Sequence, residues 1–288
     1  MEENKDFNKI IITDTLSEIA SPKMDGYLAH ALCLEGDGEF DFNGKHFTIT
    51  RQDLLIVRKG ELMTGMKFSD DFRVKVIYID KGFIEHCTPQ SNYGMKGQLA
   101  LFMNPIMHLN EAQFNLCLQD FTGVEYRFET KGFVFYQESL RCAIQLMILD
   151  FFDFHAWLGG EDSISPQFAS IMNRFFALLD SGIYREHREV TYYASEICVS
   201  PKYLSEVCKK VSGHSANFWI NRYTSLDISR LLRDRSLTFV QISDMFNFSS
   251  PAYFSRYVQN NLGTSVNWQV KAFFLASQNQ VGSGRRIV

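Results

Sequence analysis

The sequence predicts a multidomain chain that is β-rich at its N-terminal end and all-α at its C-terminal end. Strand-like runs separated by turn residues fill the first hundred positions, and apolar residues at helical spacing follow as far as about Phe274. The pattern Ser-Pro-x-Tyr-(Leu/Phe)-Ser occurs twice, at Ser200 and at Ser250, which indicates a repeated helical unit. Charge divides the chain too, because residues 1–169 carry 15 basic against 25 acidic side chains and residues 170–288 carry 14 against 8.

Composition limits the class of protein. The 288 residues are 45% hydrophobic, enough for a large core and more than one domain. We expect no membrane span, because no run of about 18 apolar residues occurs, and no secretory signal, because the N-terminus MEENKDFNKI is charged. The six cysteines are scattered without a Cys-x-x-Cys pair. This argues against a zinc site or a disulfide framework and favours a cytoplasmic protein.

The N-terminal strands are predicted from β-branched and aromatic runs bounded by turn residues. Tyr27–Leu34, Asp53–Val57 and Arg73–Asp80 each fit a strand. Phe40–Ile49 fits a hairpin, because its central Asn-Gly pair supplies the positive φ values of a type I′ turn. Short strands at near-regular spacing predict a small barrel or sandwich. Both faces of Arg73–Asp80 carry apolar groups, so the residues of any pocket stay open.

Two helices are predicted after the strands. The first covers Asn110–Val124, and the second covers Phe135–Leu158, where apolar residues recur at steps of three and four. The second is too apolar for a lone surface helix, so it either packs on the β part or pairs with a second chain. Gly159–Pro166 is the predicted linker. The last twelve residues lack periodicity and are predicted to be disordered.

The first copy of the repeated pattern predicts a helix-turn-helix. Ser200 is a good N-cap and proline follows it, so a helix begins there and ends before Gly213. Thr191–Ile197 predicts a shorter helix capped by Thr191, and Cys198-Val199-Ser200 is the turn between the two. The outward face of the longer helix carries Lys202, Ser205, Glu206 and Lys209.

The second copy predicts the same arrangement. Thr238–Phe246 is its first helix, and a second helix begins at Ser250-Pro251 and ends before Gly263. The outward stripe of that helix carries Ala252, Ser255, Arg256 and Gln259. The connector Ser215–Asp234 would span about 30 Å as one helix, close to the ~34 Å of a turn of B-DNA. Repeat, connector and basic charge together predict binding in two successive major grooves, with a generic helical bundle as the alternative.

Residues 174–274 resemble the tandem helix-turn-helix domain of AraC/XylS-type transcription regulators. The stretches that match are Ser200–Ser215, Trp219–Tyr223, Leu231-Leu232 and Ile242–Ser265. The N-terminal part is similar, more loosely, to the cupin-like sensor barrel and helical dimerisation segment found ahead of such domains, with Phe40–Val57 resembling the barrel's central hairpin. The resemblance implies a sequence-specific DNA-binding transcription regulator.

The domain organisation follows from the resemblance together with the residue patterns. We expect a cupin-like sensor barrel at 1–108, a helical dimerisation segment at 109–160, a linker with the start of the first helix at 161–173, a tandem helix-turn-helix domain at 174–276 and a disordered tail at 277–288. The expected partners are double-stranded DNA, a second copy of the chain, a small-molecule effector or a protein at the barrel, and RNA polymerase if the protein is an activator.

The DNA-contacting residues are predicted from the helix faces and the resemblance. The base-facing set is Lys202, Tyr203, Ser205, Glu206, Ala252, Ser255 and Arg256. The phosphate-contacting set is Lys209, Lys210 and Arg222. Where the family has a turn glycine, this chain has Cys198 in one unit and Asn247 in the other. Gln259-Asn260 replaces the family's basic pair, so we expect weaker phosphate contacts there. Glu206 is unusual at a groove-facing position but could accept from a cytosine amino group.

No catalytic or metal site is predicted, and no cofactor. Cupin metalloenzymes use a His-x-His pattern, whereas His30, His46, His86 and His108 stand apart in the sequence. No glycine-rich phosphate loop follows a strand, and no Ser/His/Asp pattern is recognisable. Two alternatives to the regulator stay open. One is a cupin-type enzyme with a helical accessory domain. The other is an interaction adaptor whose helices bind protein, without the steep salt dependence of DNA binding.

Overall fold

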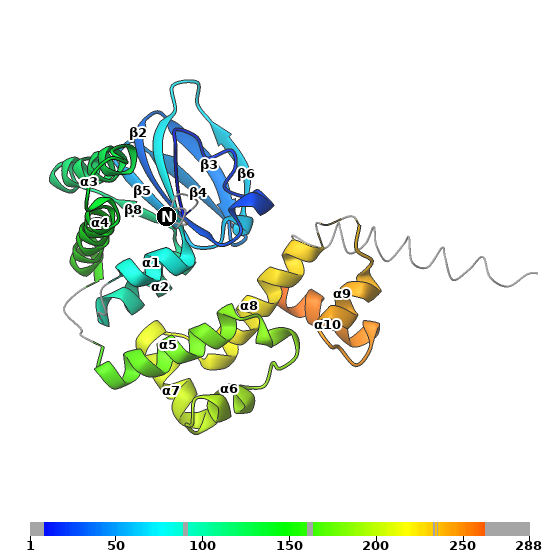
Figure 1. Cartoon of the computed structure of the whole chain (residues 1–288). Helices are drawn as coiled ribbons and strands as arrows, with labels where there is room; N and C mark the ends of the chain where they lie inside the picture. Colours follow the sequence, from blue (N-terminus) through cyan, green and yellow to red (C-terminus); the bar gives the residue numbers. More distant parts are fainter. Residues whose placement is uncertain (1–8, 89–91, 160–163, 233, 235, 263–288) are drawn as a thin grey trace, which may run out of the picture. The chain divides into compact units, whose positions relative to one another are not determined.

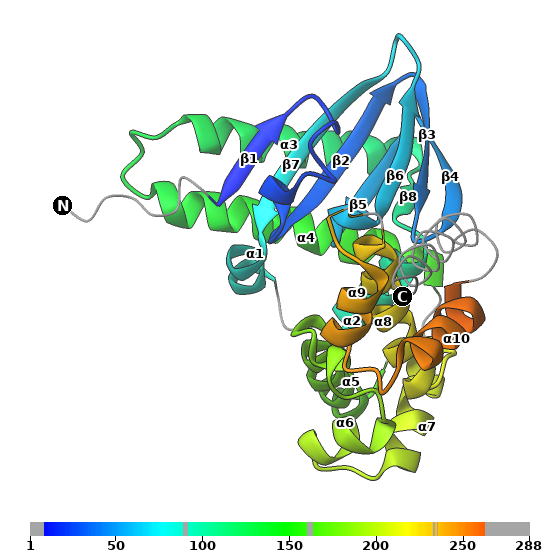
Figure 2. The ribbon, with the colours of Figure 1, turned by 90° about the vertical axis from the view of Figure 1, so that its right-hand side faces the viewer.

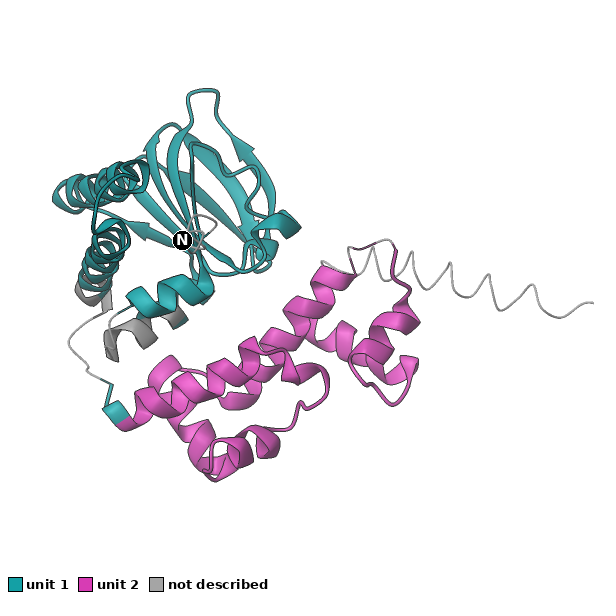
Figure 3. Cartoon of the chain, viewed as in Figure 1, with its two compact units in different colours: residues 1–166 teal, residues 167–288 magenta. Residues whose placement is uncertain are grey.

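The computed structural model of the chain describes residues 9–88, 92–159, 164–232, 234 and 236–262 (Figure 1). It divides into two compact units, Met1–Pro166 and Gln167–Val288 (Figure 3). The predicted tail at 277–288 lies outside the described residues, as does the end of the predicted DNA-binding segment. Among the helices that the structure describes, none combines the length and apolar character needed to cross a bilayer.

The strands of the first unit form two antiparallel sheets. The larger sheet has the order β1 (Ile10–Thr13), β7 (Arg73–Asp80), β2 (Tyr27–Glu35), β5 (Asp53–Val57) and β8 (Ile106–His108). The smaller sheet has the order β4 (Lys45–Thr50), β3 (Asp37–Phe42) and β6 (Met63–Phe68). Among the described residues no strand pairing joins the two sheets, so the expectation of a closed cupin-like barrel is wrong.

The break between the two sheets has a local cause. A register shift interrupts the pairing of β2 with β7 between Cys33 and Glu35, and Glu35 then makes the last pair, with Arg73. Gly36 follows with φ 72°, and a Cβ there would lie 2.7 Å from the backbone of Phe72. The chain therefore turns sharply at Gly36 and starts β3 in the second sheet. In that sheet the predicted hairpin is confirmed, because Asn43 and Gly44 both have positive φ, 57° and 73°.

Two long helices cover one face of the larger sheet (Figures 1 and 2). They are α3 (Glu111–Glu129) and α4 (Tyr136–Gly159), and two shorter helices, α1 (Lys81–Cys87) and α2 (Asn92–Met103), precede them. Ile77 and Ile79 of β7 join Ile144 and Met147 of α4 in one buried cluster. The opposite face of β7 is buried as well. That two-sided burial is why the inward face could not be chosen from sequence.

The second unit is all-α. Its helices are α5 (Pro166–Asp180), η4 (Ile183–Arg185), α6 (Val190–Glu196), α7 (Pro201–Ser212), α8 (Ala216–Leu231), α9 (Phe239–Met245) and α10 (Pro251–Leu262). The central helix α8 contacts α6 and α7 on one side of the repeat and α10 on the other. Trp219 and Ile228 of α8 are buried at these contacts. The helix-turn-helix pairs are therefore α6–α7 and α9–α10, joined by α8.

Candidate nucleic-acid interface

The longer helix of the first pair, α7, begins and ends as its sequence predicts. The Ser200 hydroxyl accepts from the backbone N–H of Tyr203 at 3.2 Å, and a proline occupies the first helical position. Gly213 closes the helix with φ 75°. Leu204 and Val207 are buried, as an inward-facing stripe requires. The opposite face of α7 is thereby left for a ligand.

The shorter helix of the first pair, α6, starts differently from the prediction. Its N-cap is Glu189, with extended backbone and no side-chain capping bond. Thr191 is already the second helical residue, so the predicted Thr191 cap is wrong. The N-cap therefore lies two residues before the predicted one, because Val190 and Thr191 are already helical. The opening helix of the other pair, α9, is capped by Thr238, which forms a capping box with Gln241, so Thr238 precedes the helix that was predicted to start with it.

The two turns share one backbone geometry. Cys198 has φ 58° and Asn247 has φ 49°, both in the left-handed region. In each pair, the backbone N–H of the next residue donates to the carbonyl oxygen five residues earlier. In the first pair Val199 donates to Ala194 O at 2.9 Å, and in the second Phe248 donates to Ser243 O at 3.1 Å. Turn residues thus repeat every 49 positions, whereas the Ser-Pro caps repeat every 50. The second pair has one extra residue between turn and cap.

The second pair exposes less of its predicted stripe. Ser250 caps α10 by accepting from Tyr253 N at 3.2 Å. Ala252 and Arg256 are exposed. Ser255 is only 6% exposed, next to the buried Phe254, so its predicted outward position is wrong. Helix α10 packs against α8 and α9, and the buried arc of α10 therefore extends as far as Ser255.

The predicted residues of α7 differ in how accessible they are. Lys202, Glu206, Lys209 and Lys210 are exposed, and Tyr203 and Ser205 are half-buried. Lys202 Nζ lies 3.9 Å from Glu206 Oε1, one helical turn away. The Tyr203 ring makes an edge contact with Phe168 of α5, with 6.5 Å between the ring centroids. A lysine and a carboxylate thus lie side by side on the exposed face.

Two predicted phosphate contacts have local constraints. Lys210 Nζ lies 5.1 Å from the centroid of the Phe168 ring, a cation–π distance. Arg222 lies on α8 and is half-buried, and burial lowers the pKa of its guanidinium. Lys209 at the end of α7 is exposed. Of these three residues, Arg222 has the least access to a ligand.

A buried charge cluster that the sequence patterns did not predict lies between η4 and α8. Asp227 of α8 is 8% exposed and accepts from Tyr184 Oη at 3.1 Å and from Arg185 Nε at 2.8 Å. Arg230 donates to its other oxygen at 2.9 Å. Burial, followed by the Asp227 charge, raises the pKa of the Tyr184 hydroxyl. The cluster fastens η4 to α8, and the only sequence signal for it was an acidic residue at a buried helical position.

The four histidines named from the sequence lie in separate settings. His46 contacts Asp41 at 3.1 Å and His108 contacts Asp53 at 2.6 Å. Burial lowers the pKa of His30 to about 4. Within the described residues, no three His, Cys, Asp or Glu side chains gather as a metal site.

Comparison with known proteins gives one family match and several structural neighbours. Residues 193–267 match the family model of a helix-turn-helix domain. No curated protein sequence matches the chain. The chain is similar to the crystal structure of ToxT from Vibrio cholerae O395, at 14% identity over 85% of this chain and 89% of that one, with a TM-score of 0.42.

Two further solved structures are similar. One is unsaturated fatty acid-bound ToxT from Vibrio cholerae strain SCE256, at 15% identity over 93% of this chain and 97% of that one, with a TM-score of 0.44. The other is the AraC-like transcriptional activator CuxR, at 11% identity over 80% of this chain and 78% of that one, with a TM-score of 0.37.

Proposed function

We propose that this DNA-binding transcription regulator, whose second unit carries an AraC/XylS-type helix-turn-helix domain, binds two successive major grooves with α7 and α10. The observation that carries the proposal is the repeated turn, with a left-handed residue and the same five-residue hydrogen bond before each Ser-capped helix. A single helix, α8, joins the pairs. Its 16 residues span about 24 Å, less than the predicted connector.

The exposed face of α7 supports a specific base preference. A lysine donates well to the O6 and N7 atoms of guanine, and a carboxylate accepts from the amino group of cytosine. Lys202 and Glu206 lie one turn apart and 3.9 Å from each other. We assign them to a G·C pair in the first half-site. Tyr203 and Ser205, half-buried, keep a secondary place in the base-facing set.

The exposed face of α10 offers fewer polar contacts. Arg256 is its basic candidate for a base or a phosphate, and Ala252 can contact a thymine methyl group. Ser255 is withdrawn from the base-facing set because it is buried. Lys209 and Lys210 are assigned to phosphates, and Arg222 only if its half-buried guanidinium reaches the backbone. The first half-site should therefore contribute more of the specificity.

We assign the first unit, covering the predicted barrel and helical segments, to regulation by a small molecule. The Tyr78 hydroxyl supports this. It lies on the face of β7 turned away from α4, is 1% exposed, and has no hydrogen-bond partner in the described structure. Burial, followed by the Glu18 charge, raises its pKa to about 12, so it is a neutral donor and acceptor. Native mass spectrometry should find a retained small molecule in the wild type and less in Tyr78→Phe, and equal occupancy would contradict the assignment.

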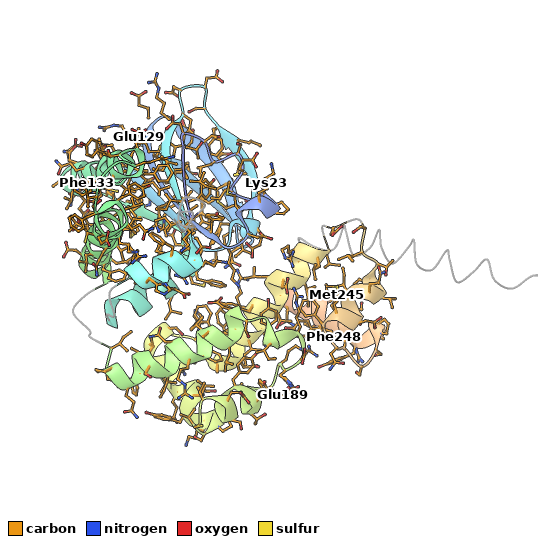
Figure 4. The ribbon with its side chains drawn as sticks, in the orientation of Figure 1. Lys23, Glu129, Phe133, Glu189, Met245 and Phe248 are labelled. Carbon is orange, nitrogen blue, oxygen red and sulfur yellow. The ribbon has the colours of Figure 1, made fainter. Side chains whose placement is uncertain are left out.

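Apolar side chains on α3, α4 and their connection support pairing with a second copy of the chain. The exposed ones are Leu116, Tyr126, Phe133, Val134, Phe135, Leu146 and Leu149. Phe133 lies at one end of the α3–α4 pair (Figure 4). The buried stripe of α4 packs on the sheet, so a dimer would use its other face. Sedimentation of the wild type and of Leu146→Glu should give a dimer and a monomer, respectively, and a monomeric wild type would remove this proposal.

Selection from genomic fragments tests the proposed DNA binding. The full chain at about 150 mM salt, where nonspecific binding is screened, should recover a motif of two short blocks about one helical turn apart. Failure to enrich any motif, with the full chain and with residues 167–288 alone, would overturn the proposal and favour the protein-binding adaptor. Enrichment by residues 167–288 alone would mean that the first unit masks the DNA-binding helices. Activation, with RNA polymerase as a partner, and a cytoplasmic location belong to the same proposal.

A further inference from the structure

Arg188 lies in the segment before α6 yet contacts the turn of the other helix-turn-helix pair. Its guanidinium donates to the carbonyl oxygen of Phe246 at 2.5 Å and to that of Asn247 at 3.4 Å. It also donates to Arg185 O at 2.9 Å, within its own segment. Residues 58 and 59 positions apart are thereby joined by one side chain. The family match begins at residue 193, so Arg188 lies outside it.

The carbonyls that Arg188 binds are ones that a helix end leaves unsatisfied. Phe246 is the C-cap of α9, and Asn247 is the left-handed turn residue. The last carbonyls of a helix have no intrahelical partner and carry partial negative charge. A guanidinium offers several donors in one plane and suits such a group of oxygens better than an ammonium does. Arg188 therefore stabilises the turn that sets the start of α10.

The same guanidinium also contacts the recognition helix through an aromatic side chain. It lies 4.2 Å from the centroid of the Phe248 ring. The Phe248 ring in turn packs against Phe254 and Tyr257 of α10, at centroid distances of 5.0 and 5.2 Å. Figure 4 labels Phe248 and Glu189, the neighbour of Arg188 in the chain. A continuous path of contacts thus runs from the first pair into α10.

On its other side the Arg188 segment is fixed to the first pair and to α8. The hydroxyl of Tyr193, in α6, donates to His187 O at 3.0 Å. Tyr184 and Arg185 bind the buried carboxylate of Asp227 in α8. Both ends of the contact are therefore anchored. Helix α10 already packs against α8, and the Tyr257 hydroxyl donates to Asn221 Oδ1 at 3.0 Å. The Arg188 contacts add an attachment at the other end of the module, at the turn before α10, and so restrict tilting of α10 on α8.

We propose that Arg188 is a positioning residue that fixes α10 relative to α7 and so sets the spacing of half-sites that the protein accepts. The inference rests on the proposed binding to two grooves. A rigid pair of modules binds tightly only to sites whose separation matches its own, and a loosened pair tolerates several separations with a lower maximum affinity. Arg188 would act without touching DNA.

The substitution that tests this is Arg188→Met. Methionine keeps an apolar stem against Phe248 but cannot donate to the carbonyls of the turn. The matched control is Arg174→Met, because Arg174 is an exposed arginine of the same unit and donates to a carbonyl of the first pair, Glu196 O at the end of α6, at 3.3 Å. Arg188→Lys keeps the charge and should restore part of the wild-type behaviour.

Binding is measured with the full chain on the two-block operator recovered by selection, and on versions with one or two base pairs added or removed between the blocks. We expect Arg188→Met to bind the native spacing roughly tenfold more weakly and to lose most of the preference for that spacing. Affinity for a probe with only the first block should stay unchanged. An equal loss at every spacing would indicate a lost phosphate contact and would overturn the inference. An unchanged spacing profile would also overturn it, while leaving two-groove binding intact.

A second measurement needs no operator. Amide hydrogen exchange in residues 246–262 should be faster in Arg188→Met than in the wild type, whereas exchange in α7 should be the same. The Arg174→Met control should match the wild type in both regions. Equal exchange of residues 246–262 in the wild type and Arg188→Met would overturn the inference that Arg188 fixes α10, even if no operator were found. If the wild type bound no DNA but exchange in residues 246–262 were faster in Arg188→Met, the role of Arg188 in fixing α10 would be supported and the proposed function would fail.

Discussion

In the turns of both helix-turn-helix pairs, a residue with a side chain holds the left-handed backbone that glycine adopts most easily. Cys198 and Asn247 occupy equivalent turn positions at φ 58° and 49°. This conformation costs an ordinary L-residue about 1–2 kcal/mol, and asparagine less. Cys198→Gly should therefore stabilise the second unit by about 0.5–1 kcal/mol, after the entropy that glycine adds to the unfolded chain is subtracted. Asn247→Gly should stabilise the second unit by a smaller amount, because asparagine tolerates this backbone better than cysteine does.

Urea unfolding of the full chain checks this pair of substitutions. Gly213→Ala is the control, because Gly213 has φ 75° and nothing within 4 Å of an added Cβ, so only backbone strain changes. That variant should lose stability while Cys198→Gly gains it. A loss in Cys198→Gly would show that the cysteine side chain contributes more than the strain costs.

A carboxyl pair between α3 and α4 gives the first unit a pH dependence. Asp120 and Asp150 are hydrogen-bonded to each other. Burial raises the pKa of Asp150, and the nearby Asp153 charge raises it as well. Burial, followed by the Asp150 charge, raises the pKa of Asp120 from 3.8 to about 7. The folded state therefore holds a proton that the unfolded state releases. The contribution of Asp120 to the free energy of unfolding is therefore greatest below about pH 4, and it is lost as pH rises through about 7.

Unfolding of the first unit at about pH 5 and about pH 8 measures that loss. In Asp120→Asn, an amide keeps a hydrogen bond to Asp150 without a titrating proton, so the difference between the two pH values should shrink. Glu125→Gln is the control, because Glu125 on the same helix pairs with Lys75 at 2.5 Å instead of with a carboxylate. The same pH difference in wild type and Asp120→Asn would rule out the pair as its source.

At the scale of elements, the features predicted correctly depend on residues close in sequence. The caps at Ser200 and Ser250 are set by a hydroxyl, a following proline and a backbone N–H three residues on. The β3–β4 hairpin depends on Asn43-Gly44 alone. Such signals are complete within a few residues, so the sequence pattern suffices. The bounds of β5 and β7 are also as predicted, because the ends of each apolar run are marked by charged residues or turns.

The features that were wrong or missed depend on contacts between distant segments. Closure of the strands into a barrel depends on pairing between strands of the two sheets, and the tight approach of Gly36 to Phe72 at the break is a contact between residues 36 positions apart. Ser255 is buried because α10 packs against both α8 and α9. Arg188 bonds to residues 58 and 59 positions away. Periodicity gives the side of a helix that is buried, but not how far around the helix the burial extends.

Substitutions on the exposed face of α7 should distinguish residues that contact bases from residues that contact phosphates. Lys202→Ala should weaken binding to the selected operator by about 1–3 kcal/mol and relax the preference at one position. Lys209→Ala should weaken binding to all sequences alike and lower the salt slope by about one. Titrations on the operator and on a scrambled duplex at several salt concentrations compare the two variants. Equal affinity of wild type and Lys202→Ala for the operator would remove Lys202 from the base-facing set.

At the scale of the whole molecule, charge divides between the units. Residues 1–166 hold 25 acidic against 15 basic side chains, and residues 167–288 hold 14 basic against 8 acidic. Nonspecific DNA affinity is almost entirely electrostatic and rises with the positive charge that faces the phosphates. An acidic unit on the same chain repels the duplex. Specific binding should therefore depend more on base contacts and on both helix pairs acting together than on attraction to the backbone.

Removal of the first unit should raise nonspecific affinity. Residues 167–288 alone should bind a random duplex more tightly than the full chain at low salt, because the net repulsion of ten acidic charges is lost. The gap should narrow as salt rises, since the Debye length falls from about 10 Å at 0.1 M to about 3 Å at 1 M. A gap that stayed constant with salt would point to steric masking of the DNA-binding helices by the first unit. In that case a bound effector, and not ionic strength, should be what releases them.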